Sequence, residues 1–552
     1  MRGVGAGCWG ALLLLQLAPA AACAPPPRPP TPAAELLPRT RAERTGYLET
    51  SRHADVVVFL DSLRALGAPV RVASLGRSTE GRDIPYVVAS RPLVAGPEEA
   101  RRVGRPVVYV QGNIHGGEVE GKEALQALLR DLALSTAPNA LDSVVLVAVP
   151  IYNADGNERV APQAVNRGEQ NGPELVGQRA NGAGLDLNRD YVKVEAPETR
   201  AALALFNAWD PDVFVDLHTT DGSFHGYALT YAPSLNPAAA LGAHTRDSVL
   251  PELRRRMRGR HQVETFDYGN FSLEYGADVD TDSVKRAWYT YDHRPRFGSN
   301  YYGLRGRVAI LGEAFSHDPF ARRVASTYAF VSEILSLAAE RGWPGATPAP
   351  CAPGGCPVAI RSQLTATPYS GVVSAEVLAR AADTTERTEP GVPRGLRRTG
   401  RLHPQRLAVY DRFTPELTTT PPAAYLLDSA LGAAVRVLRA HGVVVGRLVA
   451  DDSGEAAAFA IDSVVTAARA FQGHREVRLV GRWRTVRRRL PAGAYVVTSD
   501  QPLAVLATYL LEPESDDGLV TWNFLDGVLR PGADFPVLRL LAPPTAARRY
   551  EP

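Results

Sequence analysis

Apolar, strand-like segments alternate with amphipathic helical segments between residues 107 and 341, and this alternation is the strongest constraint on the fold. Strands that are apolar throughout are typical of a sheet that helices cover on both faces. The pattern therefore predicts an α/β domain with three layers, α/β/α, around a mixed, largely parallel sheet. The predicted strands are Val107 to Gly112, Val144 to Pro150, Val213 to Leu217 and Val308 to Leu311; the predicted helices are Ala124 to Leu134, Pro197 to Trp209, Ala238 to Arg258 and Phe320 to Arg341.

Two changes in composition divide the chain of 552 residues. Pro25 to Pro38 is Pro-rich and is predicted to be an extended tether, and Gly345 to Pro357 is predicted to be a linker. Beyond residue 360, Val-rich alternation between Pro and Gly predicts a smaller β-rich domain. The predicted organisation is a leader (1–24), a tether (25–42), the α/β domain (43–344), a linker (345–360) and the C-terminal domain (361–552).

The C-terminal domain is predicted to have strands at Arg478 to Val480 and Ala494 to Thr498 and one helix near Ala430 to Ala440. An acidic segment, Leu511 to Gly518, precedes the aromatic segment Trp522 to Asp526. Runs of charge are usually solvated, so we expect an exposed loop on a packed β domain. Contact of this loop with substrate or calcium is the alternative.

The leader has the composition of a secretory signal peptide. A short basic start containing Arg2 is followed by the apolar run Trp9 to Ala18 and a tract of small residues. A transmembrane anchor is the weaker alternative, because the run has about half of the roughly 20 residues that a spanning helix needs. We therefore expect export to the periplasm or the medium, and no stable membrane span. Cys23 loosely resembles a lipobox cysteine, which leaves a lipid anchor open.

Two of the remaining cysteines lie close together, with Cys351 and Cys356 enclosing a Pro/Gly turn. In an oxidising compartment they are predicted to form a small loop disulfide. A zinc site at this pair would need two further ligands, and the neighbouring sequence supplies no other His or Cys.

The charge balance argues against a nucleic-acid partner. Lys and Arg total 61 against 59 Asp and Glu, so the formal net charge is +2. The arginines are scattered and matched by acids, which is unlike the basic stripe of a phosphate-binding surface.

Metal-ligating side chains stand where two of the predicted strands end. His115 and Glu118 follow Val107 to Gly112, and His218 closes the segment that begins at Asp212. Ends of parallel strands meet in one crevice, so these side chains can form a two-His, one-Glu zinc site with an open fourth position. The alternative is a chance HxxE motif and a hydrogen-bonded histidine.

Four flanking motifs accompany these ligands. They are Leu75 to Arg82 (LGRSTEGR), Asn153 to Gly156 (NADG), Gly184 to Asp190 (GLDLNRD) and Leu311 to Phe315 (LGEAF). In this order they resemble the zinc carboxypeptidases of the M14 family, over roughly residues 43 to 340. Ala154 replaces the proline of the family's NPDG turn but leaves its Asp-Gly unchanged.

The resemblance implies that His115, Glu118 and His218 bind one Zn²⁺ per chain and that Glu313 is the base that activates the zinc-bound water. It also implies that Asp186 accepts a hydrogen bond from a zinc histidine, His115. Such a partner fixes the tautomer and orientation of the imidazole. A helix-capping role for Glu313 and a plain turn role for Asp186 are the alternatives.

The resemblance further implies that Asn188 and Arg189 bind the terminal carboxylate of the substrate, since a guanidinium can bind a carboxylate through two parallel hydrogen bonds. Arg189 could instead pair on the surface with Asp190 or Glu195. A second arginine would stabilise the oxyanion. Arg179 is the preferred candidate, and Arg159 and Arg167 remain alternatives.

A tyrosine that closes over the substrate belongs about twenty residues before the base in that family. Tyr291 fits this spacing best, and aromatic packing in a loop is the alternative reading.

The resulting functional hypothesis is a zinc metallocarboxypeptidase that hydrolyses the C-terminal amide of peptides with a free C-terminus, by Glu-assisted attack of zinc-bound water. A second hypothesis is a zinc amidohydrolase acting on peptidoglycan stem peptides or small N-acyl amino acids. A third is a binding protein with a relic fold, which the intact ligand set disfavours. About 91 residues separate Ala24 from His115, which leaves little for an inhibitory prodomain, so we expect no zymogen.

Overall fold

A mixed sheet of eight strands positions the candidate metal ligands and Glu313. The computed structural model describes residues 37–271, 285–341, 355–385 and 387–550. The chain divides into two units, 1–37 and 38–552, and the first contributes only Leu37 to the described residues. The predicted signal peptide, Cys23, most of the tether and most of the linker lie outside them.

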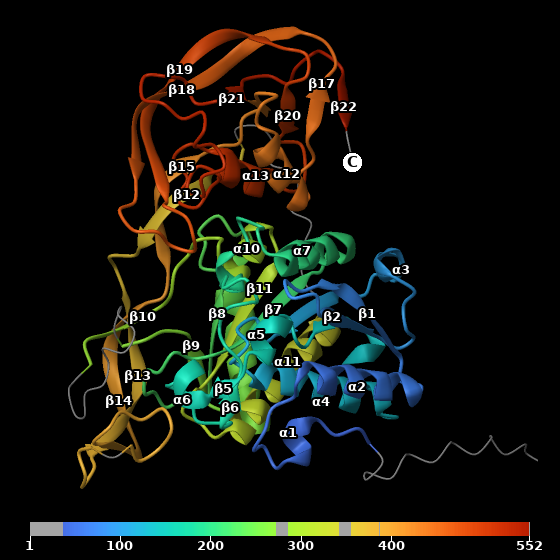
Figure 1. Cartoon of the computed structure of the whole chain (residues 1–552), viewed down its shortest axis with the longest axis vertical. Coiled ribbons are helices and arrows are strands. Elements are labelled where there is room, and N and C mark those ends of the chain that lie inside the picture. The colour runs from blue at the N-terminus through green and yellow to red at the C-terminus, as the bar shows by residue number, and fades with distance from the viewer. Residues whose placement is uncertain (1–36, 272–284, 342–354, 386, 551–552) are drawn as a thin grey trace, which may run out of the picture. The chain divides into compact units, whose positions relative to one another are not determined.

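The strand order of the sheet is β1-β2-β4-β3-β7-β11-β8-β9 (Figure 1). The four central strands β4, β3, β7 and β11 are mutually parallel. At one end β1 and β2 are antiparallel to their neighbours, and at the other end β8 is antiparallel to β11 and parallel to β9. All four predicted strands are therefore neighbours at the centre of the sheet. The bounds are β1 Val70–Arg77, β2 Asp83–Ala89, β3 Val107–Gly112, β4 Val145–Val149, β7 Val213–Thr219, β8 Leu229–Pro233, β9 Thr265–Asp267 and β11 Val308–Ala314.

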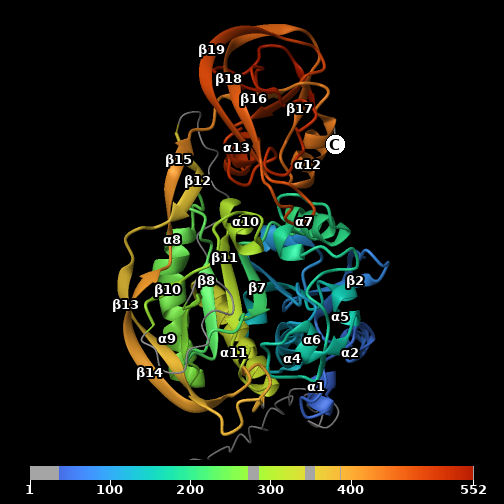
Figure 2. The ribbon, with the colours of Figure 1, turned by 60° about the vertical axis from the view of Figure 1, so that its left-hand side comes forward.

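Helices cover both faces of this sheet, which confirms the predicted three-layer architecture (Figures 1 and 2). Val108 and Val110 of β3 belong to the core with α2, α4, α9 and α11, whereas Tyr109 between them packs in the core with α7 and α10. Successive side chains of a strand point to opposite faces, so both faces are apolar and the strands read as unbroken apolar runs. The helices are α2 His53–Ala65, α4 Glu120–Leu134, α7 Pro197–Trp209, α9 Leu250–His261, α10 Gly298–Leu304 and α11 Phe320–Arg341.

The predicted helix over Ala238 to Arg258 is present, but it begins later and is not α-helical throughout. A continuous helical segment runs from Gly242 to His261 as a short helix α8 (Gly242–His244), a π-helical turn (Thr245–Val249) and α9. Pro251 lies in the first turn of α9. Proline has no N–H to donate to the preceding turn, so it favours the start of a helix rather than its interior.

Short elements connect the larger ones in the N-terminal part of the chain. They are α1 Arg41–Arg44, α3 Pro97–Val103, a 3₁₀ turn Ala140–Asp142, α5 Ala154–Glu158, β5 Ala161–Pro162, α6 Gln163–Asn166, β6 Leu175–Val176, a 3₁₀ turn Leu187–Arg189 and β10 Ala287–Tyr289.

The region after residue 355 is β-rich, as predicted. A seven-stranded sheet has the order β19-β18-β21-β16-β20-β17-β22, β12 pairs with β15, and β13 and β14 form a long hairpin. Strand β10 pairs in parallel with β14, so strands from both sides of the predicted linker share one sheet. The bounds are β12 Val358–Leu364, β13 Tyr369–Arg380, β14 Leu396–Tyr410, β15 Phe413–Thr419, β16 Ala424–Leu427, α12 Gly432–Ala440, β17 Gly446–Leu448, β18 Asp452–Thr466, β19 Val477–Leu490, β20 Tyr495–Thr498, α13 Ala504–Leu511, β21 Val537–Leu540 and β22 Arg548–Tyr550.

Cys356 is disulfide-bonded, and its predicted partner Cys351 lies outside the described residues. Among the helices that the structure describes, none is both long and apolar enough to cross a bilayer.

A buried histidine joins α12 to the α/β layers. His441 Nε2 lies 3.2 Å from the Val192 carbonyl and Nδ1 lies 2.7 Å from the Tyr301 hydroxyl. Nε2 therefore donates to the carbonyl and Nδ1 accepts from Tyr301, an assignment that requires the neutral ring. Burial, together with the nearby charge of Arg305, lowers the pKa of His441 to about 3.

We expect acid to weaken the protein through His441. Because the folded-state pKa is below the unfolded value, the folded chain binds fewer protons between about pH 3 and 6.5, and stability falls as pH falls through that window. In His441→Gln the free energy of unfolding should fall less steeply with acid, by up to about 1.4 kcal/mol per pH unit below pH 6. Urea unfolding of both proteins at pH 7, 6 and 5 measures this difference, and parallel pH profiles would refute it.

Candidate active site

The turn between β3 and α4 carries the first two candidate ligands. Asn113 has a φ of 62°, and its Nδ2 lies within 3.2 Å of the carbonyls of His115, Gly116 and Glu118. A Cβ on Gly116 would lie 2.3 Å from the carbonyl carbon of Gly156. Only glycine allows this close approach of two backbones, and the turn is held so that His115 and Glu118 face the same space.

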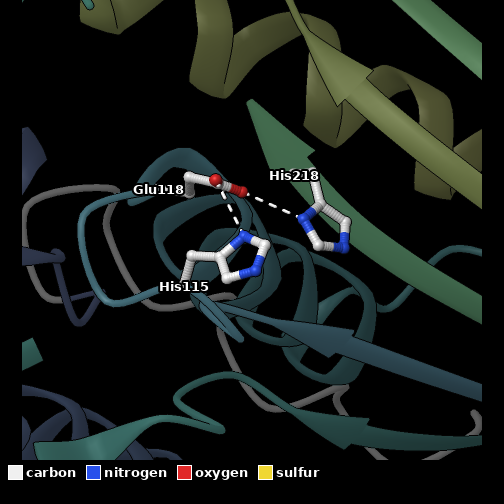
Figure 3. A group of neighbouring side chains, drawn as sticks. All are labelled: His115, Glu118 and His218. Atoms are coloured by element: carbon white, nitrogen blue, oxygen red, sulfur yellow. Dashed lines mark hydrogen bonds and ion pairs between the residues drawn. The ribbon is translucent and has the colours of Figure 1, made fainter. Parts of the chain in front are cut away.

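The carboxylate of Glu118 lies between two imidazoles (Figure 3). His115 Nδ1 lies 2.8 Å from Glu118 Oε1, and His218 Nδ1, at the end of β7, lies 3.0 Å from Oε2. All three side chains are at most 4% exposed, and their potential ligand atoms lie within 4.8 Å of one another. The structure thus brings together the three ligands that the sequence predicted.

The outer nitrogen of each imidazole faces a carboxylate. His115 Nε2 lies 3.1 Å from Asp186 Oδ1, which is the contact predicted for Asp186. His218 Nε2 lies 3.0 Å from Asp216 Oδ2, although the two atoms are not aligned as a hydrogen bond. The hydrogen bond to Asp186 holds the proton of His115 on Nε2 and leaves its Nδ1 lone pair to face inward.

This donor set fits zinc. Two inward-facing Nδ1 atoms and one buried carboxylate form the two-His, one-Glu set of catalytic zinc sites, which leaves a fourth position open. The pKa of Glu118 lies well below its usual value, because His115 and Arg167 outweigh the effect of burial. A metal ligand must be ionised, and Glu118 meets this requirement.

Glu313 faces the ligands from the neighbouring strand. It lies on β11 directly opposite His218 of β7 in parallel register, and it is 7% exposed. Burial, together with repulsion from Glu118 and Asp221, raises the pKa of Glu313 well above its usual value, against the opposing effect of His218. A carboxyl group held in such a position can accept a proton and return it.

The three candidate oxyanion arginines lie in different places. Arg179 lines the pocket beside the ligands, with Nε 2.9 Å from Asp186 Oδ2 and a side chain that is 38% exposed. Arg167 is buried, and its Nη1 lies 3.0 Å from Glu118 Oε1. Arg159 instead contacts Glu80 and the Gly182 carbonyl. Of the three, only Arg179 is among the residues that line the pocket.

Asn188 and Arg189 line the same pocket. Asn188 Oδ1 accepts a hydrogen bond of 2.8 Å from the backbone N–H of Gly298. The Arg189 guanidinium stacks over the ring of Phe297, with Cζ 3.9 Å from the ring centroid. The turn that carries Asn188 and the loop before α10 therefore support each other.

Tyr291 also lines the pocket, and its hydroxyl lies 2.6 Å from Ser299 Oγ. It packs with Tyr268 and Leu311. The aromatic packing that we weighed as the alternative is thus present, and it does not remove Tyr291 from the pocket.

The sequence analysis missed several lining residues. Leu311 had a usable signal, because it lies two positions before Glu313 on the same strand and therefore shares its face. Asp216, which contacts His218 but is not among the lining residues, had the same signal relative to His218. Tyr268 and Phe297 had none, because they come from loops that only the tertiary structure brings to the strand ends. The complete lining is His115, Glu118, Arg179, Asn188, Arg189, His218, Thr219, Asp221, Tyr268, Tyr291, Phe297, Ser299, Leu311 and Glu313.

The chain is similar to known zinc carboxypeptidases. Residues 56–296 match the peptidase M14 family model, described as zinc carboxypeptidase. The chain is 25% identical over 499 residues to Carboxypeptidase 2 of Trichophyton equinum, which covers 84% of this chain and 81% of that protein. It is 32% identical over 237 residues to human Carboxypeptidase D, covering 36% of this chain and 17% of that protein. Among solved structures, a metallo-carboxypeptidase from Burkholderia cenocepacia aligns with a TM-score of 0.38 and 20% identity, over 52% of this chain and 69% of that one.

Proposed function

Since this chain belongs to the zinc carboxypeptidase family, we propose that its pocket hydrolyses the C-terminal amide bond of peptides and binds one Zn²⁺ per chain through His115, Glu118 and His218. Zinc supplies a Lewis acid that lowers the pKa of water and polarises a carbonyl oxygen. The main support for this proposal is that the three candidate metal ligands, Glu313, and the pair Asn188 and Arg189 all line one pocket.

Glu313 is the proton carrier in this proposal. Its carboxylate accepts a proton from the attacking water and donates it to the leaving amine. Its raised pKa strengthens the carboxylate as the base that takes the proton from water. Arg179 has an exposed portion that can reach the scissile carbonyl, and it supplies positive charge where the oxyanion develops. Tyr291 lines the same pocket and borders the substrate in this proposal.

Arg189 and Asn188 select a chain end in this proposal. The stacked guanidinium of Arg189 is a planar donor for the terminal carboxylate, and a peptide amide in the same place offers no matching negative charge.

We expect Arg189→Met to raise KM for peptides with a free C-terminus by about 10- to 100-fold, since a charged hydrogen bond contributes about 1.5–3 kcal/mol. The effect on kcat should be smaller. Steady-state kinetics test this, with Arg159→Met as the matched control because Arg159 does not line the pocket. An unchanged KM in Arg189→Met would contradict the assignment.

The direct test of the proposed function is product analysis on paired substrates. Peptides with free or amidated C-termini and peptidoglycan stem peptides are incubated with the zinc-loaded protein, and the products are identified by mass spectrometry. Release of single C-terminal residues only from free C-termini supports the proposal. Cleavage of stem peptides without such release would favour the amidohydrolase.

We also propose export, supported by the basic start, the apolar run and the small-residue tract of residues 1–24. Sequencing the N-terminus of the protein recovered from its host tests this, and a lipid on Cys23 would appear as an added mass on the N-terminal peptide.

A further inference from the structure

The acidic segment near residue 517 is buried against the α/β region, which corrects the expectation of a solvated loop. Asp517 is fully buried. Its Oδ2 accepts a 2.7 Å hydrogen bond from the backbone N–H of Arg296, and its Oδ1 accepts from Arg296 Nε at 2.9 Å. Trp522 Nε1 donates to the same carboxylate at 2.9 Å. Asp517 therefore fixes the backbone directly before Phe297, the residue on which the Arg189 guanidinium stacks.

The connection between β18 and β19, residues 467–476, contacts the segment that carries Asn188 and Arg189. Gln472 Oε1 accepts a 3.2 Å hydrogen bond from the backbone N–H of Asp186. His474 Nε2 lies 2.9 Å from Glu195 Oε1. These contacts hold the turn that begins at Asp186 and carries Asn188 and Arg189.

A third contact runs through a buried lysine. Lys193 Nζ donates to the Arg189 carbonyl at 2.7 Å and lies over the Trp522 ring, 4.4 Å from its centroid. The aromatic residue thus shields the cation that holds the backbone of Arg189.

We call Asn188, Arg189, Phe297 and Gly298 the carboxylate corner. Three residues of the C-terminal region, Gln472, Asp517 and Trp522, contact the backbone on both sides of this corner or the lysine that holds it. Two-point binding of a carboxylate needs a fixed guanidinium, and displacement of about 1 Å can remove much of the benefit.

We propose that Gln472, Asp517 and Trp522 are positioning residues for recognition of the terminal carboxylate, so that the C-terminal region completes the substrate site. The inference rests on the proposed function. In this inference the C-terminal region fixes the backbone of the carboxylate corner, and its residues do not touch the reacting atoms.

Gln472 offers the sharpest test, because its side chain can be changed at nearly constant shape. Gln472→Met removes the acceptor, whereas Gln472→Glu retains it. Position 472 has a left-handed backbone with a φ of 51°, so Gln, Met and Glu must all adopt the same conformation there. Arg475→Met is the control, since Arg475 is exposed in the same connection. The full-length, zinc-loaded proteins are compared on a peptide with a free C-terminus, and a peptide ending in a D-residue serves as a competitive inhibitor.

For Gln472→Met we expect KM and the inhibition constant to rise about five-fold, the usual effect of one lost hydrogen bond. We expect kcat and zinc content to stay within two-fold of wild type, and Gln472→Glu and Arg475→Met to resemble wild type. Hydrogen exchange at the Asp186 amide should be faster in Gln472→Met alone. Because exchange needs no turnover, it reports the contact independently of activity.

Three results would overturn the proposal. One is an unchanged KM, inhibition constant and exchange rate in Gln472→Met. Another is loss of zinc with an unchanged KM, which would assign Gln472 to the metal site through Asp186. The last is a wild-type protein that releases no C-terminal residues. This result refutes the proposed function itself, and the wild-type measurement reveals it without any variant.

Discussion

Glu313→Gln is expected to lower kcat about 10³-fold, within the range that general acid–base catalysis contributes, while zinc content and KM change little. The amide has the shape of the carboxyl group but cannot accept and return a proton. The position is buried and lies opposite His218, and Glu313 is not one of the three candidate metal ligands. Single-turnover kinetics and metal analysis on the purified variant measure both quantities.

The matched control is Glu416→Gln, which makes the same chemical change on an exposed position of β15. It should retain wild-type kcat. A Glu313→Gln protein that binds zinc and keeps more than a tenth of the activity would show that another group carries the proton.

Removal of the metal is expected to abolish hydrolysis altogether, and stoichiometric zinc should restore it. Without the ion, water in the pocket keeps its high pKa and the carbonyl is not polarised. His115→Ala should bind zinc more than 100-fold more weakly, since changes to groups that only support a ligand already cost about 10- to 100-fold. Chelator dialysis followed by zinc titration measures the affinity, with His244→Ala, an exposed position on α8, as control.

Full activity in the dialysed, metal-free protein would refute the zinc site. Wild-type zinc affinity in His115→Ala would keep the metal but remove His115 from its ligands.

Much of the candidate site could be predicted because local sequence determines where strands end. His115 and Glu118 come shortly after the apolar strand Val107–Gly112. His218 lies near the end of the strand Val213–Thr219, which begins with the apolar residues Val213 to Val215. Parallel strands align their carboxyl ends, so short-range pattern alone places these groups at one edge of the sheet. Asp186 was predictable from the family motif, and it contacts His115 in the structure.

The sequence favoured Arg179 but left Arg159 and Arg167 open, because the loop that carries them has no periodic pattern. Its path is decided by close contacts of backbones, such as Gly116 against Gly156 and Gly177. Likewise, Pro251 is visible in the sequence, but whether it ends a helix or kinks it depends on the packing around it.

The sequence by itself indicated the α/β layering and the candidate metal ligands, because both depend on residue type and spacing within short segments, and the family resemblance added Glu313 as the candidate base. Only the tertiary structure decided the surroundings of the carboxylate corner. Asp517 and Gln472 lie more than 200 residues beyond the backbone groups that they bind. An acidic run in a sequence predicts a solvated loop, because the sequence does not show which distant residues pair with it. Its burial follows from the match between Asp517 and the Arg296 guanidinium and amide, a pairing between distant segments that no local pattern encodes.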